Sequence, residues 1–307
     1  MSEAYHIPAM LRECIEGLNI SADGTYADLT FGGGGHSRGI LERLTGKGRL
    51  YSFDQDIEAF EHAMEDEFFR NEDADVSPAG HWRFVYGNFR YLEQWMDYYG
   101  ESGLDGVIAD LGVSFHHFDT ADRGFSFRFD GPLDMRMNRI GGKKASDVVN
   151  GYEEEELQRV LWKYGELKNA RHIAHKIAEA RKRKPIERTE ELAALTGQDK
   201  KVQTLVFQAL RMEVNDELGA LEQMLVSAGK MLRKGGRIVV LSYHSLEDRI
   251  VKNYLRSGNT DGRIEKDFYG NILTPFEVIE KGRTADAAEV ESNPRARSAK
   301  LRIAIKK

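Results

Sequence analysis

A run of four glycines, Gly32 to Gly35, follows an apolar segment and precedes His36 in "YADLTFGGGGHSRGIL". Glycine costs roughly 0.5–1 kcal/mol relative to alanine in regular structure, so four in succession indicate a sharp bend or a close approach by another group. Asp54 ends the next apolar segment, 22 residues after Gly32. A glycine turn after one strand and an acid after the next are typical of a nucleoside site, because the acid accepts hydrogen bonds from ribose hydroxyls.

The glycine pattern excludes two common phosphate-binding sites. The dinucleotide fingerprint G-x-G-x-x-G fails, because its last position falls on Ser37 or Arg38, and the P-loop fails because no lysine follows the glycines. S-adenosylmethionine (SAM) has a ribose and an adenine but no phosphate, so we expect it as the cofactor. The alternatives are a glycine turn without a ligand and an Asp54 that only caps a helix.

Apolar segments separated by helical patterns predict an α/β fold with a mainly parallel sheet. The expected strands are residues 26–30, 48–56, 83–89, 104–114, 235–245 and 298–307. The interval between the fourth and fifth strands is too long for one crossover and turns helical and charged. We therefore predict a core of residues 1–133 and 212–307 with an inserted helical subdomain at 134–211, and an irregular segment at 258–292.

The charges are segregated along the chain. The net charge is −6, yet residues 163–188 carry nine Lys/Arg against three Glu, and residues 294–307 carry six Lys/Arg and no acid. The other 267 residues therefore sum to −18. A basic face on an acidic body is typical of polyanion binding. A solvated basic helix and a frayed tail are the alternative.

Composition narrows the class of protein. Cys14 is the single cysteine, which excludes an internal disulfide and a multi-cysteine zinc site, and we expect no metal. No run of ~18 apolar residues and no signal-peptide pattern are present, so we expect a cytoplasmic protein without a membrane partner. In "SYHSLEDR", Ser245 and Asp248 fit a capping box better than a hydrolase triad.

Six blocks of the chain resemble the bacterial small-subunit rRNA methyltransferase H family. They are "DLTFGGGGHSRGIL", "DGVIADLGVS", "RGFSFRFDGPLDMRM", "FQALRMEVNDEL", "LSYHSLEDRIVK" and "NPRARSAKLR". The resemblance implies a Rossmann-like SAM-dependent methyltransferase core with an inserted helical domain. It implies transfer of a methyl group to N4 of a cytosine in 16S rRNA of the small ribosomal subunit, the decoding-centre cytosine 1402. The rivals are an amino-methyltransferase acting on another nucleic acid or a protein, and a non-catalytic RNA-binding assembly factor.

The resemblance also implies which residues contact the cofactor. They are Gly34, Gly35, His36, Asp54, Phe89, Asp110 and His117. His117 is a departure, since this chain reads "SFHHFD" where the family usually reads "SSPQLD". A histidine can still donate one hydrogen bond in place of the glutamine.

Asp110 is the candidate catalytic residue. Many amino-methyltransferases place a D/N-P-P-aromatic loop after the fourth strand, and this chain has "DLGVSF" there. The Asp110 carboxylate could accept a hydrogen bond from the amine that is methylated or from the SAM ammonium. The methyl on a sulfonium is already activated, so alignment is the main requirement of catalysis.

The RNA-binding candidates are basic residues of the insertion and of the tail. They are Lys168, Arg171, Lys176, Arg181, Lys182, Arg183, Lys184, Arg295 and Arg297. A base that is methylated must leave its stack, so aromatic residues near the site are expected to receive it. Phe115, Phe125, Phe127 and Phe129 are candidates, with ordinary packing as the alternative for each.

Overall fold

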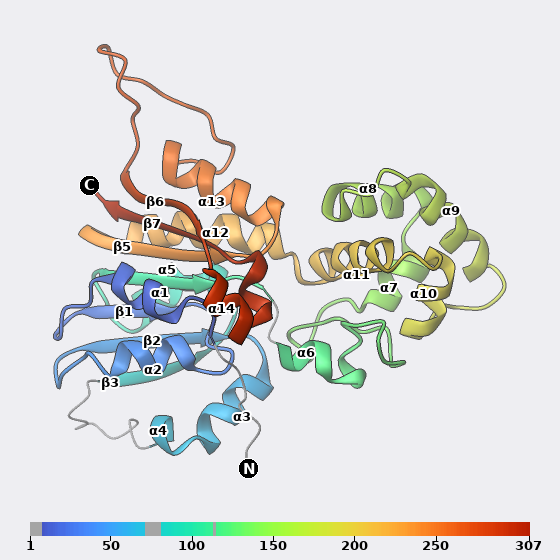
Figure 1. Cartoon of the computed structure of the whole chain (residues 1–307), viewed down its shortest axis with the longest axis horizontal. Helices are drawn as coiled ribbons and strands as arrows, with labels where there is room; N and C mark the ends of the chain where they lie inside the picture. Colours follow the sequence, from blue (N-terminus) through green and yellow to red (C-terminus); the bar gives the residue numbers. More distant parts are fainter. Residues whose placement is uncertain (1–7, 71–80, 113–114) are drawn as a thin grey trace. The chain divides into compact units, whose positions relative to one another are not determined.

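The computed structural model describes residues 8–70, 81–112 and 115–307 (Figure 1). The chain divides into two compact units. The sheet unit comprises Met1–Gly112 and Leu218–Lys307, and the helical unit comprises Val113–Glu217. The helical unit thus starts earlier and ends later than the 134–211 insertion expected from the sequence. The reason is local: Leu133 N donates to Glu187 O (2.8 Å) and Gly131 N to Thr189 Oγ1 (3.0 Å), which ties residues before 134 to the helices.

Seven strands form one sheet in the order β3-β2-β1-β4-β5-β7-β6. Their bounds are β1 Thr25–Asp28, β2 Arg49–Asp54, β3 His81–Tyr86, β4 Leu104–Asp110, β5 Leu232–Ser242, β6 Phe276–Thr284 and β7 Lys300–Lys306. The first five are parallel, whereas β7 runs antiparallel to β5 and β6 antiparallel to β7. This arrangement confirms the predicted α/β class. The carboxyl ends of the parallel strands share one edge, where ligands of such sheets bind.

Helices cover both faces of the sheet (Figure 1). In the sheet unit they are α1 Leu11–Leu18, α2 Gly35–Leu41, α3 Ile57–Glu65, α4 Glu67–Arg70, η1 Phe89–Tyr91, α5 Leu92–Tyr98, α12 Glu217–Met231, α13 Ser245–Ser257, α14 Ala287–Ser292 and η3 Pro294–Ser298. Successive strand residues point to opposite faces. Val107 therefore joins a core with α5, α12 and α13, and Ile108 joins a second core with α1, α2 and α3.

The helical unit contains short helices packed through apolar faces. They are α6 Phe115–Asp119, η2 Ala121–Arg123, α7 Ala145–Gly151, α8 Glu154–Gly165, α9 Ala170–Arg181, α10 Thr189–Thr196 and α11 Lys200–Asn215. On α8 the buried residues Leu157, Val160, Leu161 and Tyr164 recur at helical spacing. Across the described ranges, none of the helices combines the length and the apolar character needed to cross a membrane.

The segment after α13 differs from its prediction. The sequence predicts irregular structure at residues 258–292, but they contain the edge strand β6 and helix α14. Strand β6 reads "FEVIEKGRT" and, of its residues, only Phe276 is buried. An exposed edge strand lacks the apolar run by which a buried strand is recognised, so little in the residue pattern indicates it.

Candidate functional site

Asp54 ties the glycine turn to the end of β2. Its Oδ2 accepts the Gly32 N–H (2.9 Å) and its Oδ1 accepts the Asp56 N–H (2.9 Å). Burial raises the pKa of the Asp54 carboxyl to about 6, although these two backbone hydrogen bonds oppose the rise. A carboxylate has about four lone-pair sites, so two remain for a ligand's hydroxyl groups.

The glycines of the turn serve two purposes. At Gly34 the backbone has φ 75°, and a Cβ there would lie 2.5 Å from the Phe69 ring. A Cβ on Gly35 would lie 2.6 Å from Pro8 Cγ. These two glycines therefore permit close packing of the turn. Gly32 has φ 51°, and among the described residues the nearest atom to a Cβ there would be Thr30 O at 4.0 Å. Within the described part of the chain, space is therefore open at Gly32, whose N–H is bonded to Asp54.

Asp110, at the end of β4, is held by two neighbours. Its Oδ1 accepts the Tyr243 hydroxyl (2.7 Å), and its Oδ2 lies 3.8 Å from His36 Nδ1. Burial raises the pKa of the Asp110 carboxyl to about 6, against the charge of His36 and the Tyr243 hydrogen bond. The side chain keeps 15% exposure. Asp110 is therefore positioned, mostly desolvated and still reachable.

His36 is buried, and its side chain bridges two segments of the sheet unit. Nε2 lies 3.2 Å from Ala9 O, and Nδ1 faces Asp110. The ring thus links the segment before α1 to the end of β4. The expected contact of His36 with the cofactor stays a prediction.

Asp28 is a third carboxylate at this edge, and the sequence analysis did not single it out. It ends β1, is buried, and accepts the Ser37 hydroxyl at Oδ2 (2.7 Å) and the Thr30 N–H at Oδ1 (3.1 Å). Burial raises its pKa, and the charge of Asp28 in turn raises the pKa values of Asp54 and Asp110. Its position at the end of the first strand, beside the glycines, is the signal that could have found it.

Phe89 and Tyr86 lie where β3 ends. Phe89 begins η1 and packs, partly buried, against the core of α5 and α12. The Tyr86 hydroxyl is buried and has no hydrogen-bond partner among the described residues. A buried hydroxyl without a partner calls for an explanation, and a ligand group is one.

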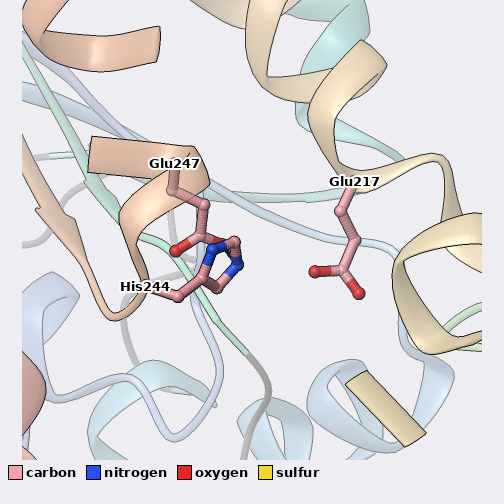
Figure 2. Close-up of side chains that lie close together, drawn as sticks. All are labelled: Glu217, His244 and Glu247. Carbon is pink, nitrogen blue, oxygen red and sulfur yellow. Dashed lines mark ion pairs between the residues drawn. The ribbon is translucent and has the colours of Figure 1, made fainter. Parts of the chain in front are cut away.

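His244 and Glu247 lie at the end of β5, where α13 begins (Figure 2). His244 Nε2 is 3.1 Å from Glu247 Oε1, and Glu247 Oε2 accepts the Tyr243 N–H (3.1 Å). Glu247 thus fixes the turn that carries Tyr243. Glu217, also labelled in Figure 2, is the last residue of the helical unit, where it pairs with Arg211 (2.7 Å).

The predicted helix after the fifth strand is confirmed, because α13 begins at Ser245, but the predicted capping box is wrong. The N-cap residue of α13 is His244, and it makes no side-chain cap hydrogen bond. Asp248 instead pairs with Arg302 (2.7 Å) and Lys300 (3.2 Å) on β7. The Asp248 carboxylate thus has its partners on a strand more than 50 residues away along the chain.

His117 belongs to the helical unit. It is buried, and its ring stacks on Phe125 with centroids 4.8 Å apart. Its expected cofactor contact stays a prediction. Phe125 is buried and Phe127 packs on Phe207 (5.4 Å), so both contribute to packing, whereas Phe129 is exposed. The Phe115 side chain lies outside the described residues.

The basic candidates of the insertion fall into two groups. Lys168, Arg171, Lys176 and Arg183 are exposed. Three others have partners within the unit: Arg181 donates to Val149 O (2.8 Å), Lys182 pairs with Glu179, and Lys184 pairs with Glu191 (2.5 Å). Exposed ion pairs contribute about 0–1 kcal/mol, so Lys182 and Lys184 can exchange partners, whereas Arg181 holds the end of α7.

An open cavity of about 370 Å³ lies between α9 and α10. Its lining includes the basic residues His175, Lys176 and Arg183 and the apolar residues Ala180 and Leu195. In the tail, Arg295 and Arg297 lie exposed on η3. The expected phosphate contacts of all these cations stay predictions.

The residues at the sheet edge fit SAM. A positive charge nearby favours the ionised form of a carboxyl, and three carboxyls with raised pKa values lie here. SAM carries two positive charges, on its sulfonium and its ammonium. The open space at Gly32 and the Tyr86 hydroxyl provide room and a polar group for the nucleoside part.

Comparison with known proteins adds independent information. A model of the MraW methylase family matches residues 3–307. The "Ribosomal RNA small subunit methyltransferase H" of Parabacteroides distasonis is 54% identical over 98% of this chain and 97% of its own. The protein of the same name from Bacteroides thetaiotaomicron is 50% identical over 99% and 98%. Among solved structures, an rRNA methylase from Streptococcus thermophilus aligns over 96% of this chain and 93% of its own, with 11% identity and a TM-score of 0.39.

Proposed function

This chain belongs to the MraW methylase family, and we propose that it transfers a methyl group from SAM to N4 of a cytosine in 16S rRNA. The proposed substrate is the small ribosomal subunit in the cytoplasm, and the proposed acceptor is the decoding-centre cytosine. Relatives at about 50% identity that bear the name of rRNA small-subunit methyltransferase support the rRNA substrate. N4 and the decoding centre are the finer part of the proposal and rest on the sequence resemblance.

The cofactor part of the proposal rests on Asp28, Asp54 and Asp110, which end three parallel strands at one edge of the sheet. When bound, SAM supplies a methyl group that its sulfonium already activates. Asp54 is proposed to accept hydrogen bonds from ribose hydroxyls, since its remaining lone pairs lie beside the open space at Gly32. Ser37 and Thr30 already donate hydrogen bonds to the two oxygens of Asp28. Asp28 is therefore proposed to act on the ligand through its charge rather than through a hydrogen bond.

Asp110 is proposed to orient the reacting groups. Tyr243 fixes one carboxylate oxygen, so the other can accept a hydrogen bond from an ammonium or from the acceptor amine. With a pKa of about 6, most Asp110 carboxyls are ionised at neutral pH. An ionised acceptor placed in a desolvated site stabilises developing positive charge more strongly than water does.

The helical unit is proposed to bind the RNA backbone. Its exposed cations Lys168, Arg171, Lys176 and Arg183 match the charge of phosphate. This role depends on charge and exposure, and it needs no base-specific contact.

A methyl-transfer assay tests the proposed function. Small ribosomal subunits from a strain lacking this protein are incubated with the enzyme and labelled SAM, and the digested rRNA nucleosides are identified by mass spectrometry. We expect new N4-methylcytidine. Label in another nucleoside would overturn the N4 assignment, and no label in subunits or free rRNA, with SAM bound, would overturn the rRNA substrate.

A further inference from the structure

An arm projects from the sheet unit between α13 and β6. Figure 1 shows residues 259–274, called the arm below, as a long excursion of the chain beyond α13 and β6. Its two sides are joined by a bridge between Lys266 and Ile272 and by a hydrogen bond from Leu273 N to Glu265 O (2.8 Å). Nothing in the proposed methyl transfer uses it.

Exposed apolar side chains concentrate on this arm. Twelve large apolar side chains are exposed in the described part of the chain, and five of them lie within ten residues here. They are Ile264, Phe268, Tyr269, Ile272 and Leu273. Phe268 and Tyr269, at the tip, are 97% and 87% exposed. Scattered exposed apolar residues are ordinary, but a local concentration marks an interaction surface.

The tip of the arm is a turn stabilised by side-chain hydrogen bonds. Asp267 Oδ1 accepts the backbone N–H groups of Tyr269 (2.9 Å) and Asn271 (2.8 Å), and its Oδ2 accepts Asn271 Nδ2 (2.9 Å). These bonds lower the pKa of the Asp267 carboxyl. The chain therefore holds the two aromatic residues outward, at the end of an ordered loop.

The base of the arm is held by hydrogen bonds within the arm and to α13. Asn259 exchanges two hydrogen bonds with the backbone of Arg263 inside the arm (2.7 and 2.8 Å), and Thr274 Oγ1 donates to Leu255 O on α13 (3.2 Å). A loop held in one conformation loses little further entropy on binding, which favours association.

The chemistry of the arm selects a protein rather than a nucleic acid. Residues 261–273 carry three acids and two bases, so the net charge is −1, which disfavours phosphate. Three of the exposed apolar side chains are aliphatic, and aliphatic side chains lack the aromatic face on which bases stack. Aromatic anchors with aliphatic neighbours fit an apolar pocket, and the net negative charge of residues 261–273 fits a basic rim.

We propose that the arm docks its aromatic tip into an apolar, basic-rimmed pocket on a protein of the small ribosomal subunit. The proposal rests on the proposed function, because that function names the particle that carries the partner. The arm then recognises the assembled particle, while the helical unit recognises RNA.

The test compares two substrates and three proteins. The double variant Phe268→Ser/Tyr269→Ser, the wild type and a control, Tyr98→Ser, are measured for binding and KM on assembled small subunits and on protein-free 16S rRNA. Tyr98 is 76% exposed on α5, so the control also removes an exposed aromatic residue of the sheet unit. Thermal melting checks that each variant folds.

We expect the double variant to bind subunits at least tenfold more weakly and to bind free rRNA like the wild type. The control should match the wild type on both. Equal loss on free rRNA would overturn the proposal in favour of base stacking, and unchanged binding to subunits would overturn it outright. Variant-dependent self-association in sedimentation would assign the arm to a second copy instead.

A failure of the proposed function can be distinguished from a failure of the docking proposal. If the wild type methylates neither substrate, the reaction is wrong, while co-sedimentation of wild type and double variant with subunits still decides the docking. Binding that depends on Phe268 and Tyr269 would then support the arm's role without the reaction.

Discussion

The carboxylates at the edge of the sheet and the cations of the helical unit differ in sign, burial and pairing. Asp28 is buried and Asp54 and Asp110 are largely so, and burial raises the pKa of each. In the helical unit, Lys182 and Lys184 are exposed and pair with nearby acids. Buried charges are costly unless something compensates them, whereas exposed pairs cost and contribute little. This difference supports the proposal that the first region binds one specific cation and the second binds many interchangeable phosphates.

The largest effect should follow from Asp110→Asn. The substitution keeps the shape of the side chain and an oxygen for Tyr243, but it removes the charge. We expect single-turnover methyl transfer with labelled SAM to fall at least ~100-fold, the usual loss for an electrostatic group at a reacting centre. Tyr243→Phe, which leaves the charge but frees the carboxylate, should lose less. An Asp110→Asn rate near that of wild type would remove the distinction between the two regions.

Asp54→Asn should act on cofactor binding. Hydrogen bonds to a charged group contribute about 1.5–3 kcal/mol, so the Kd for SAM should rise roughly 10- to 100-fold in calorimetry. Asp56→Asn is the matched control, because Asp56 lies two residues on and its side chain caps α3. Equal losses in the two variants would mean that the effect comes from local structure rather than from the Asp54 charge.

The pH dependence of SAM binding and of stability provides a further test of the carboxylates. A cationic ligand favours ionised carboxylates, so SAM affinity should rise as pH increases through 6, the pKa of Asp54 and Asp110. Below that pH it should fall by up to about tenfold per unit for each carboxyl. Stability without ligand runs the other way: between pH about 4 and 6 the folded state binds more protons than the unfolded state, so the free energy of unfolding should decrease as pH rises. Calorimetry and thermal melting from about pH 4 to about pH 8 measure the two slopes, and parallel slopes between about pH 4 and 6 would contradict the assignment.

The smallest effects should come from the helical unit. Lys176→Ala with Arg183→Ala removes two exposed cations, and we expect RNA affinity to fall severalfold. The slope of log K against log salt should flatten by roughly 0.7–0.9 for each phosphate that is no longer neutralised. Lys182→Ala with Lys184→Ala removes the same charge from cations already paired with acids, and its effect should be smaller. A larger effect of the second double variant would show that ion pairing does not predict which of these cations bind RNA.

The sequence was sufficient where the signal is local. The glycine turn, Asp54 and Asp110 follow apolar runs, and the structure places all three at one edge of the sheet. Contacts between distant segments were not predictable. Tyr243 meets Asp110 across 133 residues, and no residue spacing indicates such a pair.

The basic residues illustrate the same limit. Arg302 alternates with Lys300 on the last strand and resembles an exposed cation in the sequence. The structure buries it and pairs it with Asp248 on α13, because β7 lies inside the sheet beside β6. Arg181 likewise resembles its neighbours in the basic run, yet it donates to Val149 O. Charge alone does not indicate which cation is free for a ligand.

The position of the helical unit between β4 and β5 in the chain affects how the protein folds while it is being synthesised. Asp110 pairs in register with Leu241, so the nascent chain exposes the edge of β4 until 131 more residues have been made. At roughly 5–20 residues per second, that interval is on the order of ten seconds. The helical unit is synthesised within it, and its internal contacts shorten the loop that β5 must close. Asp110 therefore gains its partner only after β5 has been made, and a chain released before Tyr243 would lack that partner.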